Sequence, residues 1–264
     1  MYNNSSVIKN PIDKIISRFK TQNPFSVIEF PFIWFLICLF HDLGYTIEDT
    51  EKFKDFDEFI DGRVKYFLNQ RVGVPSLYER TYKNYFNYRL KSRNKSINKP
   101  DHGICGGVLL FNELNSILKR ERLNNKSEGL SWNKKLINIY KYTSWVILSH
   151  NMFFIRTGDS NEDEYLQNKL DELILSPAEK SKINLEKHSF LFLFLLVDSI
   201  DPIKIVNEYK NLKDIDIECI GNKINMEIKN ISIIDDFSKK VLELKKCLIP
   251  KISVEDNKIT ITIE

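Results

Sequence analysis

The sequence predicts a mainly α-helical protein, a helical bundle followed by a small C-terminal α+β appendage. Three observations predict this. Apolar residues recur at helical spacing through most of the chain. Glycine and proline are few, with nine and eight among 264 residues. Beyond residue 211, apolar and polar residues alternate instead. We therefore expect a helical domain at 1–210 with an insertion at 45–100, and an appendage at 211–264.

The composition is typical of a folded protein. Apolar residues make up 42% of the chain and charged residues 28%, a balance that disordered segments lack. The formal net charge is only +3, so the overall charge by itself predicts neither a nucleic-acid partner nor a membrane surface. Any such partner must be argued from local charge.

Cysteine usage and the apolar runs favour a cytoplasmic protein. Cys38, Cys105, Cys219 and Cys247 are widely separated in sequence and none has the spacing of a zinc or redox motif, so we expect reduced thiols. The N-terminus lacks the pattern of a signal peptide. The runs 32–40 and 190–197 are about half as long as the ~20 residues that span a membrane. We expect them to form buried helices, with no membrane partner.

The first two elements are predicted to be helices. Apolar residues at helical spacing predict one over 7–19, and the proline-bounded stretch 24–31 separates it from a second, apolar helix. That second helix carries FIWFLICLFHDLG and its apolar run ends at His41 and Asp42. Gly44 stands where a left-handed C-terminal cap is expected.

The insertion at 45–100 is polar and aromatic, acidic at first and then basic, and we interpret it as a lid or cap region. A helix should follow Asp101 as its N-cap, and Gly106 and Gly107 indicate close packing against a neighbouring element. Further helices are predicted over 132–152 and 185–209. In the appendage, IDIECIGNKINMEIK and KISVEDNKITITIE each predict a hairpin, and DDFSKKVLELKKCL between them predicts a helix.

Four ionisable groups interrupt or end apolar helical sequence. Three histidines occur in the contexts LFHDLGY, PDHGICGG and ILSHNMF, and the run FLFLFLLVDSIDP delivers Asp198. Burying an unpaired charge costs several kcal/mol or more, so these groups need partners. A divalent cation is a partner common to all of them, because imidazole nitrogens and carboxylate oxygens suit Mn, Fe, Co, Ni or Zn. A helix C-terminus also favours a cation.

The ordered set resembles the HD superfamily of metal-dependent phosphohydrolases over roughly residues 8–205. His41 and Asp42 match the name-giving pair, His102 and His150 match the intermediate histidines, and Asp198 matches the late aspartate. The chain departs from the family pattern at two points. No histidine precedes His41, where Asn10 or Asp13 stands nearest by spacing, and Tyr45 occupies the place of a basic residue that often contacts substrate.

The resemblance implies an HD-domain-like fold and one or two divalent ions, Mg included. Asp42 would bridge two ions, His41 and Asp198 would hold one, and His102 and His150 the other. A water activated between them would hydrolyse a phosphomonoester or phosphodiester, with a nucleotide as one candidate substrate. We count Asp42 and Asn151 as candidate catalytic residues, and Asn151 is equally well interpreted as an ordinary polar helix residue.

Other interpretations stay open. Each histidine can be a hydrogen-bonded core residue, His188 is interpreted as structural, and Asp201 competes with Asp198 for the late position. The fold can also serve as a catalytically silent module that binds a nucleotide or a protein. The basic, aromatic run 78–99 (Tyr78 to Lys99) favours a third alternative, a single-strand nuclease that binds nucleic acid. An exposed strand edge of the appendage offers a way to form a homodimer.

Overall fold

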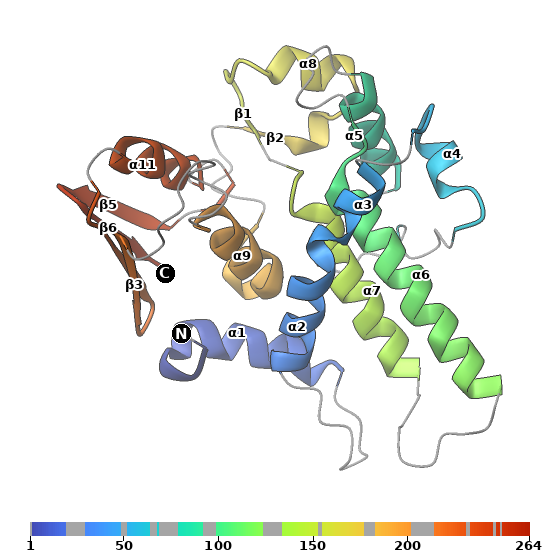
Figure 1. Ribbon diagram of the computed structural model, residues 1–264, viewed down its shortest axis with the longest axis horizontal. Coiled ribbons are helices and arrows are strands. Elements are labelled where there is room, and N and C mark those ends of the chain that lie inside the picture. The colour runs from blue at the N-terminus through green and yellow to red at the C-terminus, as the bar shows by residue number, and fades with distance from the viewer. Residues whose placement is uncertain are drawn as a thin grey trace. The chain divides into compact units, whose positions relative to one another are not determined.

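The protein is mainly α-helical with a small C-terminal β-sheet, which confirms the predicted fold class (Figure 1). A computed structural model describes residues 2–19, 30–48, 52–63, 68, 79–91, 99–123, 134–152, 155–176, 183–201, 214–230, 233–244, 247–248 and 250–264. The chain forms two compact units. The bundle unit comprises Ile15–Phe153 and Thr157–Ile174, and the sheet unit comprises Met1–Lys14, Phe154–Arg156 and Leu175–Glu264.

The bundle unit is built on two long helices that pack along each other, α6 and α7 (Figure 1). Its helices are α2 (Phe30–Phe40), the 3₁₀ turn η2 (His41–Gly44), α3 (Tyr45–Glu48), α4 (Phe56–Ile60), α5 (Glu79–Lys91), α6 (His102–Leu123), α7 (Lys134–Ser149), α8 (Glu162–Gln167) and the 3₁₀ turn η4 (Asp171–Leu173). The helices predicted after Asp101 and over 132–152 are therefore confirmed within the described residues.

Helix α6 begins and packs as its sequence predicts. The Asp101 carboxylate accepts a hydrogen bond from the backbone N–H of Ile104 at 2.9 Å, which confirms Asp101 as the N-cap. A Cβ atom at Gly107 would lie 2.6 Å from Cγ of Leu148, and one at Gly106 would lie 3.0 Å from the carbonyl oxygen of Phe40. The two glycines thus bring α6 against α7 and against the end of α2.

The left-handed cap predicted at Gly44 is wrong. Gly44 lies inside η2, and the glycines with positive φ in the described part of the chain are Gly62, Gly158 and Gly221. A Cβ atom at Gly44 would instead lie 1.8 Å from the carbonyl oxygen of His102. Glycine is needed at this position because two backbone segments touch there.

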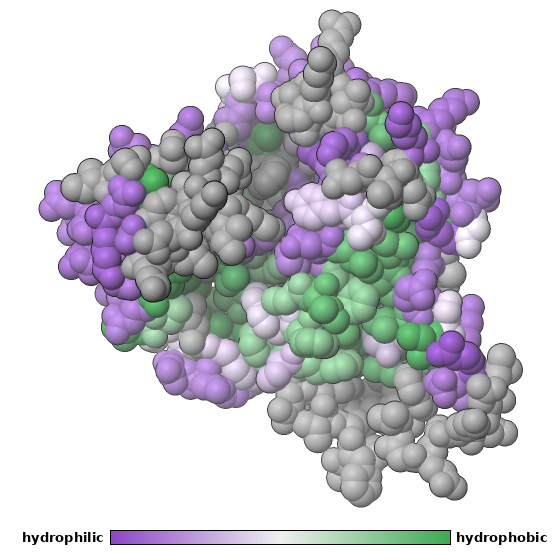
Figure 2. Space-filling model, in the orientation of Figure 1, coloured by the Kyte–Doolittle hydropathy of each residue, from purple (hydrophilic) through white to green (hydrophobic). Residues whose placement is uncertain are grey.

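Helix α2 is buried on one face only, so its prediction as a buried helix is wrong for the other face. Ile33, Leu36 and Ile37 are buried, whereas Phe35 is 60% exposed and Leu39 is 56% exposed. Figure 2 shows an apolar surface over α2. Helix α2 continues through η2 into α3, and the combined stretch Phe30–Glu48, 19 residues, is long and apolar enough to cross a membrane by length and composition alone.

The described part of the predicted insertion contains α4 and α5, which pack through aromatic rings. Phe59 stacks on Phe86 with ring centroids 5.0 Å apart, and Phe56 meets Phe86 edge-on at 5.5 Å. Asn87 of α5 accepts a hydrogen bond from the backbone N–H of Phe56 at 2.9 Å. These contacts hold α4 to α5, and the interpretation of the insertion as a lid stays a prediction.

The sheet unit contains the predicted pair of hairpins and the helix between them. Its elements are the 3₁₀ turn η1 (Tyr2–Asn4), the residues of α1 (Ser6–Ser17) up to Lys14, α9 (Leu185–Ser199), β3 (Ile215–Ile220), β4 (Lys223–Ile228), α11 (Ile234–Glu243), β5 (Lys251–Glu255) and β6 (Lys258–Thr262), and the short strands β1 (Ile155–Arg156) and β2 (Ile174–Leu175) complete the chain. The helix predicted over 185–209 is described as far as Ser199, and its remainder, 202–209, lies outside the described residues.

The four long strands form an antiparallel sheet in the order β3-β4-β6-β5. Two-residue turns close both hairpins, with Gly221 and Asp256 at positive φ. Ile224 pairs with Ile261 and Met226 with Ile259, so alternate residues place one buried apolar row on each central strand. This alternation is the pattern from which the hairpins were predicted.

Candidate functional site

Three of the four histidines lie together in the bundle unit. His41 directly follows α2, His102 is the first residue of α6, and His150 directly follows α7. The ring centroids of His41 and His150 are 6.1 Å apart, and those of His102 and His150 are 5.2 Å apart. The end of α2 and its continuation η2 pack against α6 and α7, so three segments that are distant in sequence present their imidazoles to one place.

His41 and His150 are held in the same way. Nδ1 of His41 lies 2.7 Å from the carbonyl oxygen of Cys38, and Nδ1 of His150 lies 2.6 Å from that of Ile147. Each ring reaches back three residues into the last turn of its helix. A carbonyl oxygen only accepts hydrogen bonds, so Nδ1 carries the hydrogen in both rings. In a neutral imidazole the lone pair is then on Nε2.

The ring of His102 contacts three side chains. Its Nδ1 lies 3.2 Å from Oε2 of Glu48, and the amide nitrogen of Asn151 lies 3.0 Å from its Nε2 and 3.2 Å from its Nδ1. Oε2 of Glu48 has no hydrogen-bond partner within the described part of the chain, and an amide nitrogen donates, so either nitrogen of this ring can carry the hydrogen. Tyr45 stacks on the ring, with centroids 3.9 Å apart and an interplanar angle of 20°. The structure thus places both Asn151 and Tyr45 on His102.

A buried charged cluster adjoins His102. The Arg89 guanidinium lies 3.9 Å from a carboxylate oxygen of Glu48 and 3.9 Å from one of Asp101. The side chains of Glu48 and Asp101 are 8% and 0% exposed. Burial lowers the pKa of Arg89, but Asp101 leads the opposing charges, which raise the pKa above its usual value. Arg89 therefore stays cationic and offsets the two carboxylates.

Asp42 is the candidate carboxylate beside these rings. Its Oδ2 lies 3.0 Å from Nε2 of His41, and its side chain is 47% exposed. His41 thus has an oxygen acceptor next to each ring nitrogen. A neutral imidazole has one N–H, so it cannot donate to both acceptors. Either a second proton on the ring or a cation bound by Nε2 and the carboxylate would satisfy both sides.

The residues present fit a divalent metal ion in donor type. In His41 and His150 a backbone carbonyl holds Nδ1, which is how metal-ligating histidines are usually fixed, with Nε2 as the donor. Among the residues that the structure describes, no three His, Cys, Asp or Glu side chains are already placed to hold an ion. Convergence on one ion therefore requires rotation of these side chains, and the spacing of the rings is close enough for it.

The remaining sequence-predicted residues belong to the sheet unit. Asp198 is half-buried in the last turn of α9, and Asp201 follows that helix. His188, in the first turn of α9, is 1% exposed, and its Nδ1 accepts a hydrogen bond from the backbone N–H of Asn184 at 3.2 Å. Its hydrogen is therefore on Nε2, the opposite tautomer. Asp13 pairs with Lys9 and accepts a hydrogen bond from Tyr2 at 2.5 Å, while Asn10 is exposed.

Part of the basic, aromatic run lies on α5. Its Tyr82, Tyr85 and Tyr88 are buried, and two of its cations pair with carboxylates: Arg80 with Glu172 at 2.9 Å, and Lys83 with Asp57. Tyr78 and residues 92–98 of the predicted nucleic-acid surface lie outside the described residues. The described part therefore packs its aromatic rings inward.

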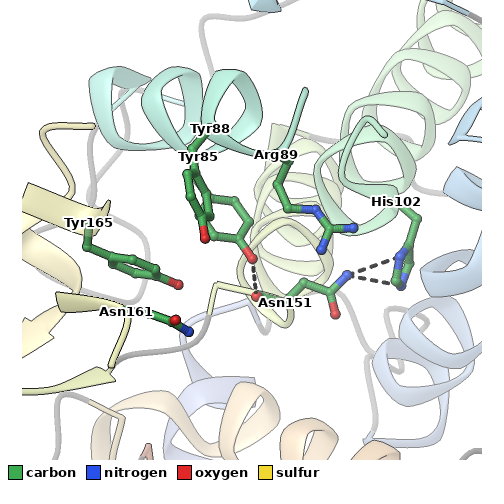
Figure 3. Close-up of a pocket in the computed structure, with 7 residues that line it drawn as sticks. All are labelled: Tyr85, Tyr88, Arg89, His102, Asn151, Asn161 and Tyr165. Atoms are coloured by element: carbon green, nitrogen blue, oxygen red, sulfur yellow. Dashed lines mark hydrogen bonds between the residues drawn. The ribbon is translucent and has the colours of Figure 1, made fainter. Parts of the chain in front are cut away.

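A pocket of about 250 Å³ opens beside the histidines (Figure 3). Helix α5 contributes Tyr85, Tyr88 and Arg89, and Tyr165 and Asn161 lie beside the two tyrosines on the side away from His102 (Figure 3). His102 and Asn151 also line it, so the pocket is continuous with the histidine cluster. Pockets for drug-sized ligands are roughly 300–1,000 Å³, which makes this one suitable for a small molecule.

Several residues of the site escaped prediction from the sequence. Glu48 and Arg89 come from the inserted region, and Asp101 was recognised only as an N-cap. Gly103 is needed because a Cβ atom there would lie 2.9 Å from the His150 ring. Their positions next to the histidines in the sequence could have predicted them: Glu48 ends the apolar stretch that carries His41, and Asp101 and Gly103 flank His102.

Comparison with known proteins supplies no relative. No family model, no curated protein and no solved structure matches this chain.

Proposed function

We propose that the chain is a metal-dependent phosphohydrolase that acts on a small phosphoester, with a nucleotide as one candidate. One observation carries the proposal: His41, His102 and His150 lie together, and a backbone carbonyl holds Nδ1 of His41 and of His150 so that Nε2 of each is the donor. Three imidazoles with a neighbouring carboxylate are a donor set that suits Mn, Fe, Co, Ni or Zn.

Each side chain has a distinct role in the proposed reaction. A divalent cation, when bound, supplies Lewis acidity toward phosphoryl oxygens. Glu48, Asn151 and Tyr45 surround the ring of His102, and the stacked Tyr45 fixes its plane. Asp42 offsets positive charge as a ligand. Asp198 belongs to the sheet unit, and its role as a ligand stays a prediction from the sequence.

The size of the neighbouring pocket supports a small substrate. A volume of about 250 Å³ accommodates a small phosphoester and not several nucleotides of a strand. His102 lines the pocket, so a phosphoryl group bound at the histidines directs its leaving group into it.

The test combines metal analysis with a hydrolysis screen. Purified protein is measured for bound metal and then offered nucleotides, cyclic nucleotides and short oligonucleotides with several divalent ions. Activity should disappear on chelation and return on adding metal. His41→Ala and Asp42→Ala should abolish turnover while the circular dichroism spectrum stays unchanged. Wild-type turnover in both variants would overturn the assignment.

A second candidate is a binding module without turnover, favoured by the pocket itself. Arg89 and three tyrosines line the pocket and need no metal ion to form it. This candidate predicts less than one equivalent of bound metal and no hydrolysis with any ion, together with retained binding of a small anion. Metal-dependent turnover in the screen excludes it.

A further inference from the structure

Among the side chains that line the pocket, Arg89 carries the permanent positive charge. In Figure 3 its guanidinium points toward Asn151 and His102, into the space between the tyrosines and the histidine cluster. The Arg89 side chain is 16% exposed. A cation with so little water around it interacts strongly with an anion placed beside it.

The hydrogen-bonding capacity of Arg89 is not used up. The nearest oxygens of Glu48 and Asp101 are each 3.9 Å away, which is too long for a hydrogen bond. Nε of Arg89 is fully buried and faces Asp101, so a ligand in the pocket contacts the terminal nitrogens of the guanidinium, which points into the space beside Asn151 in Figure 3. A phosphoryl group matches the planar fork of the guanidinium and supplies two acceptors at once.

The tyrosines form fixed aromatic walls beside Arg89. The Tyr85 hydroxyl donates to the carbonyl oxygen of Asn151 at 2.7 Å, and that of Tyr88 donates to a carboxylate oxygen of Glu164 at 3.1 Å. The rings of Tyr88 and Tyr165 meet at 61° with centroids 5.5 Å apart. Rings held in this way offer a preorganised surface to a flat, apolar group.

We propose that this pocket binds a small organic phosphate that carries a single planar ring. Arg89 takes the phosphoryl oxygens, and the adjoining rings of Tyr88 and Tyr165 form one aromatic wall against which the planar ring packs. Calling this ligand the substrate rests on the proposed hydrolase function, whereas the proposal that the pocket binds it does not. Arg89 and its two carboxylates sum to a formal charge of −1, so a divalent cation at the histidines should strengthen the binding of the anion.

The experiment uses phenyl phosphate as the probe and isothermal titration calorimetry as the measurement, with and without Zn²⁺ or Mn²⁺. Arg89→Lys keeps the positive charge that Glu48 and Asp101 require but loses the forked pair of donors. We expect it to weaken phenyl phosphate binding at least tenfold. Arg80→Lys is the matched control, because Arg80 lies on the same helix outside the pocket. It should change the affinity less than twofold.

A second comparison tests the aromatic walls. Wild-type protein should bind phenyl phosphate more tightly than methyl phosphate, and Tyr165→Leu should reduce this preference by about three- to tenfold. Equal affinities in Arg89→Lys and Arg80→Lys overturn the pocket proposal, and so does the absence of binding with and without metal. Metal-dependent hydrolysis alongside such a result leaves the proposed function standing. Binding of phenyl phosphate that depends on Arg89, in a protein that takes up no metal, supports the proposed pocket and contradicts the proposed hydrolase function.

Discussion

Replacing Gly44 by alanine adds one methyl group where η2 meets the first residue of α6. The added Cβ would lie 1.8 Å from the carbonyl oxygen and 2.6 Å from the carbonyl carbon of His102, and 2.8 Å from the backbone nitrogen of Gly106. All three neighbours are backbone atoms, so no side chain can turn aside. The two segments must separate, and His41 and Asp42 move with η2 away from His102.

The expected loss of stability lies at the upper end for overpacked sites. Inserting a methyl group into a packed interior costs about 1–3 kcal/mol and occasionally more. Because the clash here is with backbone, we expect about 3 kcal/mol, which lowers the Tm by roughly 6–12 °C for a domain of this size. The assays are thermal unfolding by circular dichroism and urea unfolding.

Gly62→Ala is the informative control. Gly62 has a φ of +70°, and a Cβ there would meet nothing within 4 Å, so alanine suffers only the backbone strain of about 1–2 kcal/mol. Gly44→Ala should therefore destabilise more than Gly62→Ala. The reverse order would show that conformational freedom at Gly44, and not close backbone contact, is what its position requires.

Three further outcomes follow from the described contacts. Asp101→Ala removes both the N-cap of α6 and a buried counter-ion of Arg89, so it should lower the free energy of unfolding in urea by about 3–5 kcal/mol. Asp101→Asn keeps an acceptor for the N-cap hydrogen bond and should cost less. Equal losses in the two variants would contradict the role of Asp101 as the N-cap. Burial raises the pKa of the Cys247 thiol to about 11. The buried neutral thiol therefore contributes its full share of the folding free energy below the ordinary thiol pKa of about 8.5, and about 3 kcal/mol of it is lost as the pH rises through 11. Cys247→Ala removes the thiol, so the free energy of unfolding measured from pH 8 to 11 should fall less in this variant than in the wild type. Phe35→Ser should change the free energy of unfolding by less than about 0.5 kcal/mol, because Phe35 is 60% exposed. Phe86→Ala should cost about 3–5 kcal/mol, because the Phe86 ring is 0% exposed. A large loss in Phe35→Ser would show that the exposed face of α2 is covered.

The elements of the fold were predictable because their signals are local. The N-cap Asp101, the glycines at which α6 packs closely, and the alternating strands of the appendage are each recognised within a few residues of sequence. The histidines were recognised because each stands at the border of an apolar helix. In each case a physical requirement of one element is satisfied by neighbouring residues in the chain.

The rest of the site depends on contacts between distant segments. Gly44 looks like a helix cap in sequence, and only its approach to His102, 58 positions later, explains it. Arg89 belongs to a basic run whose sequence suggests an exposed surface, yet its charge lies beside the buried carboxylates of Glu48 and Asp101. The exposed face of α2 could not be predicted either, because Phe35 and Leu36 are both apolar and only packing makes one exposed and the other buried.

The most direct test of the metal site is a Zn²⁺ titration followed through the ring nitrogens of the histidines by ¹⁵N NMR. Before metal is added, His41 and His150 should carry hydrogen on Nδ1, and His188 should carry it on Nε2. The Nε2 resonances of His41, His102 and His150 should then shift together and saturate at one or two equivalents, while those of His188 stay unchanged. Saturating Zn²⁺ that leaves the three Nε2 resonances in place would contradict the proposed centre.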